Sequence, residues 1–262
     1  MIWKRVILIR SILKDGLFIL KNYKKERTNN MIHNDKVLED VNALLDYDSV
    51  KDFLFMNVIN AETNKEELSM EPHTVIGDLA IVYRVMIKTT DDQFCSARVT
   101  NEMLDHYGID VSQLHNDALI SSPNMMKPEI IPLETLLMGV PEQEAWQNED
   151  RHFVVLTNEH RTDGAATIFY SGVLNNLAEK LGHDLYIVPS STDECLALCD
   201  SPTLNTDRLK EMLLLMNGPS FMDQDKKLSD ILYHYDKDNH VLEKSDDYEK
   251  RINKQKYSQL LH

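Results

Sequence analysis

Short apolar runs separated by polar turns are the feature that most constrains the fold of this chain. Residues 79–87 form an almost continuous apolar run with several β-branched side chains, and residues 94–99 form a second such run. The polar segment 89–92 lies between them. Two apolar runs that flank a polar turn are typical of a β-hairpin. The sequence therefore predicts a hairpin in the first half of the chain.

Amphipathic stretches with helical spacing alternate with further short apolar runs. Residues 171–181 and 204–217 place their apolar side chains on one face, and glycines at 182 and 218 end both stretches. The other predicted strands are 53–59, 153–156, 165–170, 185–188, 195–198, 231–235 and 241–242. Because strands and helices alternate irregularly, we predict an α+β fold with mixed or antiparallel sheets and packed helices.

One segment has the order of a βαβ-like unit in the C-terminal half: strand 165–170, helix 171–181 and strand 185–188. In such a unit the strands run parallel and their carboxyl ends share an edge. That edge would hold an anion or a peptide carboxylate beside the helix N-terminus. The weak ligand-binding candidates gathered there are Tyr170, Ser171, Ser190, Ser191, Glu194 and Asn158. The alternative is that Ser171 only caps the helix and 189–191 only forms a turn. Residues 157–164 are either a flap over this edge or an ordinary loop.

Charge and turn-forming residues divide the chain into four predicted parts. Residues 1–30 are predicted to form a basic amphipathic helix, and residues 31–140 an N-terminal α+β lobe. A proline-bearing acidic stretch marks the boundary to a C-terminal α+β lobe at 151–244, and a charged tail follows at 245–262.

The first thirty residues differ from the rest of the chain in charge. They carry eight Lys and Arg against two acidic residues, whereas the whole chain has a net charge of −15. Charged residues interrupt every apolar run there, which excludes a signal peptide and a transmembrane helix. Two readings stay open: attachment to a membrane surface, or packing of the apolar face on the chain's own domain.

Composition excludes several classes of protein. The acidic balance argues against binding of nucleic acid by the bulk surface. Three cysteines are too few for a disulfide scaffold and indicate a cytoplasmic location. The ten histidines are scattered without ligand spacing, so we predict no metal and no cofactor. Short motifs of hydrolases, P-loop proteins and dinucleotide-binding proteins are missing as well. Arg84, within an apolar strand, is either a functional cation or a paired structural arginine.

Several segments resemble an uncharacterised family of Firmicutes, especially Clostridia, that is catalogued as a domain of unknown function and numbered 5688. The segments that carry the likeness read FLFMNVINAETNKEEL at 53–68, DLAIVYR at 78–84, TN at 157–158 with GAA at 164–166, Tyr170 with GVL at 172–174, DLYIVPSS at 184–191, and LSD at 228–230 with Tyr233 and YD at 235–236. The resemblance implies no activity. It implies a further N-terminal segment that is shortened here, and an apolar face left exposed there would favour association with a partner or self-association.

Three functional hypotheses follow from these observations. The first is a cytoplasmic, non-catalytic binding or adaptor domain whose partner is a protein or a small anionic ligand. The second is a hydrolase or transferase of unfamiliar type that uses the loops between 157 and 194, with Ser190 or Ser191 acting beside Glu194 or His160. The third is peripheral membrane association through the N-terminal helix.

Overall fold

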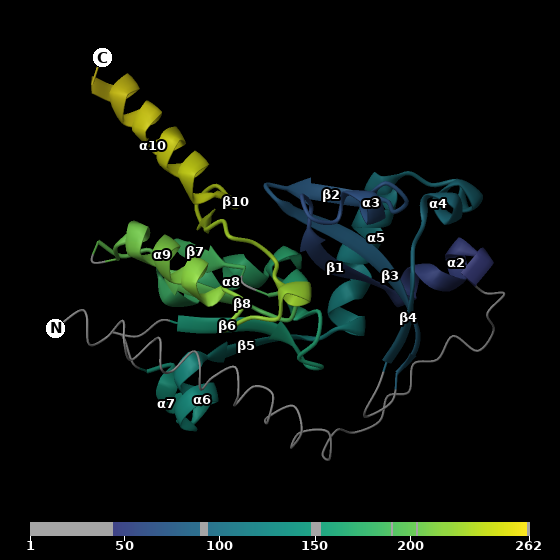
Figure 1. Ribbon diagram of the computed structural model, residues 1–262, viewed down its shortest axis with the longest axis horizontal. Coiled ribbons are helices and arrows are strands. Elements are labelled where there is room, and N and C mark those ends of the chain that lie inside the picture. The colour runs from purple at the N-terminus through teal and green to yellow at the C-terminus, as the bar shows by residue number, and fades with distance from the viewer. Residues whose placement is uncertain (1–43, 90–93, 148–152, 190, 203, 261–262) are drawn as a thin grey trace.

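A computed structural model describes residues 44–89, 94–147, 153–189, 191–202 and 204–260 (Figure 1). The predicted helix at 1–30 lies outside these residues. Two antiparallel sheets with covering helices form the body, which confirms the α+β class. The strands of the first sheet are β1 (Leu54–Asn60), β2 (His73–Ile76), β3 (Leu79–Thr89) and β4 (Phe94–Arg98). Its helices are α2 (Tyr47–Val50), η2 (Lys51–Phe53), α3 (Lys65–Leu68), α4 (Asn101–Tyr107) and α5 (Val111–Met125).

The long strand β3 organises the first sheet. It pairs with β1 along one edge, and with β2 and then β4 along the other edge. The β3–β4 pairing confirms the predicted hairpin. Helix α5 lies along β1, where the Ser122 hydroxyl accepts a hydrogen bond from the backbone N–H of Met56 at 3.0 Å. The sheet therefore has a covered edge at β1, which limits pairing with other chains there.

The second sheet has the strand order β10-β9-β7-β8-β6-β5. Its strands are β5 (Pro128–Pro132), β6 (Phe153–Asn158), β7 (Leu185–Val188), β8 (Cys195–Cys199), β9 (Tyr233–Asp236) and β10 (Val241–Lys244). Its helices are α6 (Leu133–Met138), α7 (Glu142–Ala145), η3 (Gly164–Phe169), α8 (Val173–Leu181), α9 (Thr206–Met216), η4 (Gln224–Lys226) and α10 (Ser245–Leu260). Segment 128–140, which the sequence analysis assigned to the N-terminal lobe, contributes β5 to this sheet because β5 pairs with β6.

The βαβ-like unit differs from the expectation in its first strand. Residues 165–169 belong to the 3-10 helix η3 rather than to a strand, Tyr170 follows it as its C-cap, and the Thr167 hydroxyl donates to the Gly164 carbonyl at 2.9 Å. A side chain that bonds three residues back favours a helical turn over an extended backbone. Strands β6 and β7 instead flank α8, and both pair antiparallel with β8 between them. The unit is therefore a split βαβ unit: β6 and β7 run in the same direction, but β8 lies between them and they do not pair with each other.

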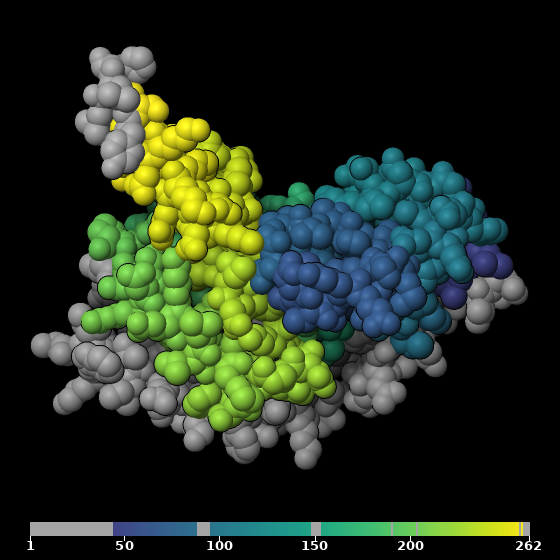
Figure 2. Space-filling view, turned by 45° about the horizontal axis from the view of Figure 1, so that its top comes forward, coloured from purple at the N-terminus to yellow at the C-terminus, as the bar shows by residue number. Residues whose placement is uncertain are grey.

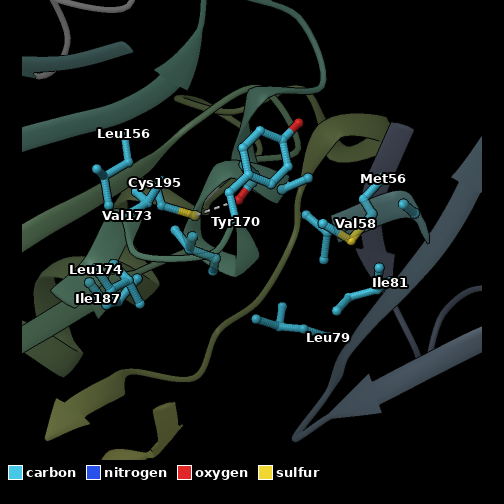
Figure 3. Close-up of a cluster of buried hydrophobic side chains, with 14 of the residues drawn as sticks. Met56, Val58, Leu79, Ile81, Leu156, Tyr170, Val173, Leu174, Ile187 and Cys195 are labelled. Atoms are coloured by element: carbon cyan, nitrogen blue, oxygen red, sulfur yellow. Dashed lines mark hydrogen bonds between the residues drawn. The ribbon is translucent and has the colours of Figure 1, made fainter. Parts of the chain in front are cut away.

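One hydrophobic core joins the two sheets (Figure 3). Met56, Val58 and Ile81 of the first sheet face Leu156 and Ile187 of the second, and all five side chains are buried. Tyr170 lies between the two groups in Figure 3 and is 3% exposed. Because this core is continuous, the two lobes are expected to fold together.

Candidate functional site

A tight loop follows β6 at the junction of the two lobes. Asn158 is fully buried, and its side chain donates to the Thr162 carbonyl at 2.7 Å and accepts from the His160 N–H at 3.0 Å. Arg161 and Asp163 have left-handed backbones with φ of 54° and 53°. Non-glycine residues in this conformation often mark functional sites. Hydrogen bonds within the loop therefore hold it in place, so it is not a free flap.

Asp163 interacts with several charged side chains at this junction. Its N–H donates to the Asp193 carboxylate at 3.2 Å, and the Lys226 ammonium donates to the same carboxylate at 2.6 Å. Burial raises the pKa of Asp163 and the Asp193 carboxylate raises it further, while Arg84, Asn57 and Lys226 oppose the change. The Oδ1 atom of Asn57 is buried and has no hydrogen-bond partner among the described residues. We call Asp163, Asp193, Lys226, Arg84 and Asn57 the loop junction.

The predicted site residues gather only in part. Asn158 and Ser191 border the loop junction, but the Ser191 hydroxyl accepts hydrogen bonds from the N–H groups of Asp193 and Glu194 at 3.2 and 3.3 Å and so closes a turn. Glu194 is half-buried, Tyr170 is enclosed in the core, and Ser190 lies outside the described residues. Ser171 is exposed and does not cap α8, because Gly172 occupies the cap with φ of 77°. A small anionic ligand at this edge stays a prediction.

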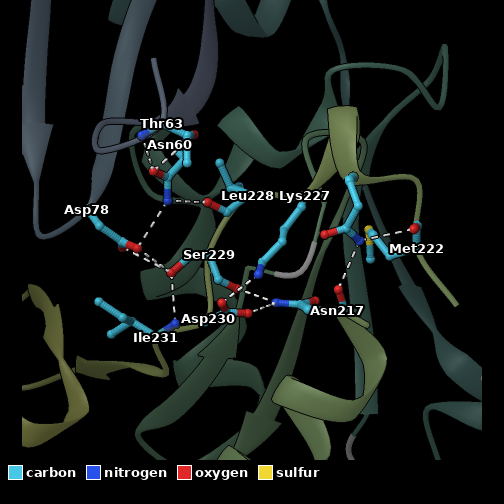
Figure 4. A network of polar contacts seen from close by, with 11 residues as sticks. Asn60, Thr63, Asp78, Asn217, Met222, Lys227, Leu228, Ser229, Asp230 and Ile231 are labelled. Atoms are coloured by element: carbon cyan, nitrogen blue, oxygen red, sulfur yellow. Dashed lines mark hydrogen bonds and ion pairs between the residues drawn. The ribbon is translucent and has the colours of Figure 1, made fainter. Parts of the chain in front are cut away.

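A polar network ties the two lobes together beside the core (Figure 4). The Asp78 carboxylate, in the turn before β3, accepts hydrogen bonds from the Ser229 hydroxyl at 2.8 Å and the Tyr233 hydroxyl at 2.7 Å. Asn60 donates to the same carboxylate at 3.3 Å and to the Leu228 carbonyl at 2.8 Å. This Asp78 network links residues about 150 positions apart in the sequence and thereby connects the two lobes.

A surface pocket of about 450 Å³ opens in the N-terminal lobe between α2, η2 and α5. We call it the α2–α5 pocket. The lining includes Asp48, Asp52 and Asp117 with one cation, Lys51, which leaves two net negative charges. Ile120 adds an apolar surface that is 73% exposed. Its size falls within the range of ligand pockets. The residues of the pocket come from segments 47–52 and 113–125, so no local sequence signal could have identified it.

The first half of α10 is anchored on the second sheet. The Tyr248 ring stacks on His234 with centroids 3.5 Å apart, and the Arg251 guanidinium bonds Asp236 at 2.8 Å and Glu243 at 2.7 Å. Burial by itself would raise the pKa of Asp236, but hydrogen bonds from Arg251 and Asn239 outweigh it and lower the pKa to about 2. The ion pair between Asp236 and Arg251 therefore contributes to the stability of the fold in a pH-dependent way.

Replacing Arg251 by methionine should raise the pKa of Asp236 toward its ordinary value and lower the free energy of unfolding at neutral pH by about 1–2 kcal/mol. A carboxyl with a lowered pKa stabilises the fold above its unfolded pKa, and this stabilisation is lost as the pH falls through the folded value. Wild type and Arg251→Met should therefore converge as the pH falls from 3.8 toward about 2. Urea denaturation across this range measures the difference, and a gap that stays constant would contradict the assignment. Lys250→Met, which removes an exposed pair with Asp247, is the matched control and should change little.

Neither a metal-binding cluster nor a membrane-spanning helix is found among the described residues. No group of three or more His, Cys, Asp or Glu side chains in these segments is arranged to hold a metal ion. Within the same segments, every helix is too short or too polar to cross a membrane.

Comparison with protein families matches residues 18–237 to a family described as "Family of unknown function (DUF5688)". This match covers most of the chain and confirms the family resemblance that the sequence motifs indicated. No curated protein and no solved structure matches the chain significantly.

Proposed function

Since the chain belongs to the DUF5688 family, whose description names no activity, we propose from the geometry that it is a non-catalytic binding domain for a lysine-bearing protein segment. The observation that carries the proposal is the α2–α5 pocket, where carboxylates surround an exposed apolar surface. A lysine side chain suits this arrangement, because its aliphatic stem covers apolar surface while its ammonium meets a carboxylate. The pocket thus offers an apolar surface to the stem of a lysine and carboxylates to its ammonium group.

The charges at the pocket support recognition of a cation. The Tyr47 hydroxyl donates to the Asp117 carboxylate at 2.5 Å, and Lys51 pairs with Asp48 at 2.7 Å. These contacts orient two carboxylates, and Asp52 adds a third that is exposed. With a net charge of −15, the chain would also attract cationic partners over a distance. Binding should therefore weaken as salt is added.

Binding of a helical Ala/Lys peptide to the full chain, measured by fluorescence anisotropy, tests the proposal. Asp52→Lys should weaken binding at least about tenfold, or about 1.4 kcal/mol, because it replaces attraction by repulsion. Ile120→Ser should weaken binding by removing the surface under the lysine stem. A peptide with diaminopropionic acid in place of lysine keeps the charge without the stem and should bind less tightly.

Matched controls come from α9, in the other lobe. Glu211→Lys reverses an exposed carboxylate and Leu214→Ser removes an apolar side chain that is 57% exposed. Both variants should bind the Ala/Lys peptide as wild type does. If Asp52→Lys and Glu211→Lys weaken binding equally, only the overall charge matters and the α2–α5 pocket is not the site.

A second candidate function is acid–base catalysis at the loop junction, favoured by Asp163. A carboxyl with a raised pKa in a strained loop is a common feature of catalytic sites. Asp163→Asn should then abolish a hydrolase or transferase activity found in a substrate screen while the chain stays folded. Activity that persists in Asp163→Asn would exclude this residue as the acid or base.

Location and membrane attachment are separate parts of the proposal. Free cysteines at 95, 195 and 199 support a reducing cytoplasm as the setting. Peripheral membrane association through residues 1–30 rests on sequence alone, since this segment lies outside the described residues. Co-sedimentation with anionic vesicles that survives charge reversal of Lys4 and Arg5 would argue against that association.

A further inference from the structure

The second half of α10 is the most isolated element of the described chain. Asn253, Lys254, Gln255, Lys256 and Ser258 are all exposed. Figures 1 and 2 show the helix rising from the C-terminal lobe, with its far end away from the other elements. A helix of this length gains little stability without tertiary contacts. Its exposed half is therefore suited to contact with another surface.

The charge of this half-helix is opposite to that of the chain as a whole. Residues 250–260 carry Lys250, Arg251, Lys254 and Lys256 and no carboxylate, in a chain with a net charge of −15. The exposed half of α10 is thus a helical lysine-bearing segment, which is the class of ligand that suits the α2–α5 pocket.

We propose that the pocket of one copy of this chain receives the exposed half of α10 from a second copy. This inference rests on the proposed function and names its partner. Helix α10 and the helices of the pocket lie toward opposite ends of the molecule (Figure 1), so the contact forms between chains. Because the two surfaces differ, the contact is heterologous, and it continues from copy to copy until a ring closes or a filament forms.

Charge complementarity sets the chemistry of the contact. Lys254 and Lys256 present ammonium groups without the pairing that Arg251 has with Asp236 and Glu243 at the anchor. In the pocket, Asp48 and Asp52 are exposed carboxylates beside Ile120. The expected association is strongest at low salt and dissociates as salt is added, because exposed ion pairs are screened.

Sedimentation velocity of the full chain tests the proposal. Wild type should associate with rising concentration, and Lys254→Glu/Lys256→Glu and Asp48→Lys/Asp52→Lys should each weaken self-association at least about tenfold. The four substitutions combined in one chain should restore association, since the charges are exchanged. Lys65→Glu/Arg208→Glu, a double reversal of exposed cations elsewhere, should leave association unchanged.

Mixing the two double variants gives the sharpest result. The intact helix of the pocket variant fits the intact pocket of the helix variant, and the two reversed surfaces also complement each other. Each variant alone should therefore associate weakly, whereas an equal mixture should associate as wild type does, with the two variants alternating. A wild type that stays monomeric, or a mixture that does not associate, would overturn the inference. If the Ala/Lys peptide still binds in that case, the proposed function stands without α10 as its ligand; if the peptide also fails to bind, both are wrong.

Discussion

Replacing Gly164 by alanine is expected to lower the free energy of unfolding by about 3 kcal/mol, because no space exists for a methyl group. A Cβ atom there would lie 2.3 Å from the Thr157 hydroxyl oxygen, 2.5 Å from the Asp193 carbonyl oxygen and 2.7 Å from the Asn158 nitrogen. Two of these three atoms belong to the backbone and cannot move independently. The loop after β6 and the turn before β8 would have to separate. Urea denaturation followed by far-UV circular dichroism measures the loss.

Gly108→Ala is the matched control for this substitution. Gly108 ends α4 with φ of 66°, and no atom of the described residues lies within 4 Å of an added Cβ atom. Its replacement should cost only the left-handed strain, about 1 kcal/mol. A loss for Gly164→Ala no larger than that of Gly108→Ala would mean that the loop relaxes easily. Since the α2–α5 pocket lies in the other lobe, Gly164→Ala should still bind the Ala/Lys peptide at temperatures where it is folded.

The sequence could predict the elements whose stability is local. The hairpin of β3 and β4 follows from two apolar runs around a polar turn, and α8 follows from its apolar spacing and the left-handed Gly182. The cap of α4 is equally local, because the Thr100 hydroxyl accepts a hydrogen bond from the Met103 N–H. In each case the residues that decide the structure lie within a few positions of one another.

The sequence could not predict features that depend on distant contacts. Residues 165–170 have the β-branched and aromatic content of a strand, yet 165–169 lie in η3, where residues 164–168 are buried among both lobes. Tertiary burial outweighs β propensity in such a segment. Helix α5 likewise continues through Pro123 to Met125 because its packing on β1 outweighs the break expected at the proline.

The candidate sites show the same division. Arg84 was identified as a charge in an apolar strand, and it bonds the Ser96 hydroxyl at 3.0 Å and acts on the pKa of Asp163. Asp163 itself carries no local signal, because its environment comes from four other segments. The α2–α5 pocket is similar, since Tyr47 and Asp117 are 70 residues apart. Sequence spacing therefore identifies an unusual residue but not the partners that give it a role.

Replacing Asp78 by alanine is expected to lower the free energy of unfolding by about 2–4 kcal/mol, since hydrogen bonds to a buried charged group are worth more than neutral ones. Asp78 is 8% exposed, and its carboxylate accepts from Ser229, Tyr233 and Asn60. Without it, Tyr233 and Asn60 keep the carbonyls of Ile76 and Leu228 as acceptors. The Ser229 hydroxyl loses the acceptor that it has in the native fold.

A double-mutant cycle separates the network from simple loss of packing. Ser229→Ala alone removes one donor to Asp78, and its effect should shrink markedly when Asp78 is already alanine, with a coupling energy of about 1 kcal/mol or more. Met138→Ser, at a side chain that is 54% exposed and outside the network, is the control and should add to Asp78→Ala without coupling. Additive effects of Asp78→Ala and Ser229→Ala would show that the two side chains act independently. A measured coupling would instead show that the Asp78 carboxylate helps to hold the two lobes together. Ser229 and Asp78 meet only when the two sheets are packed against each other.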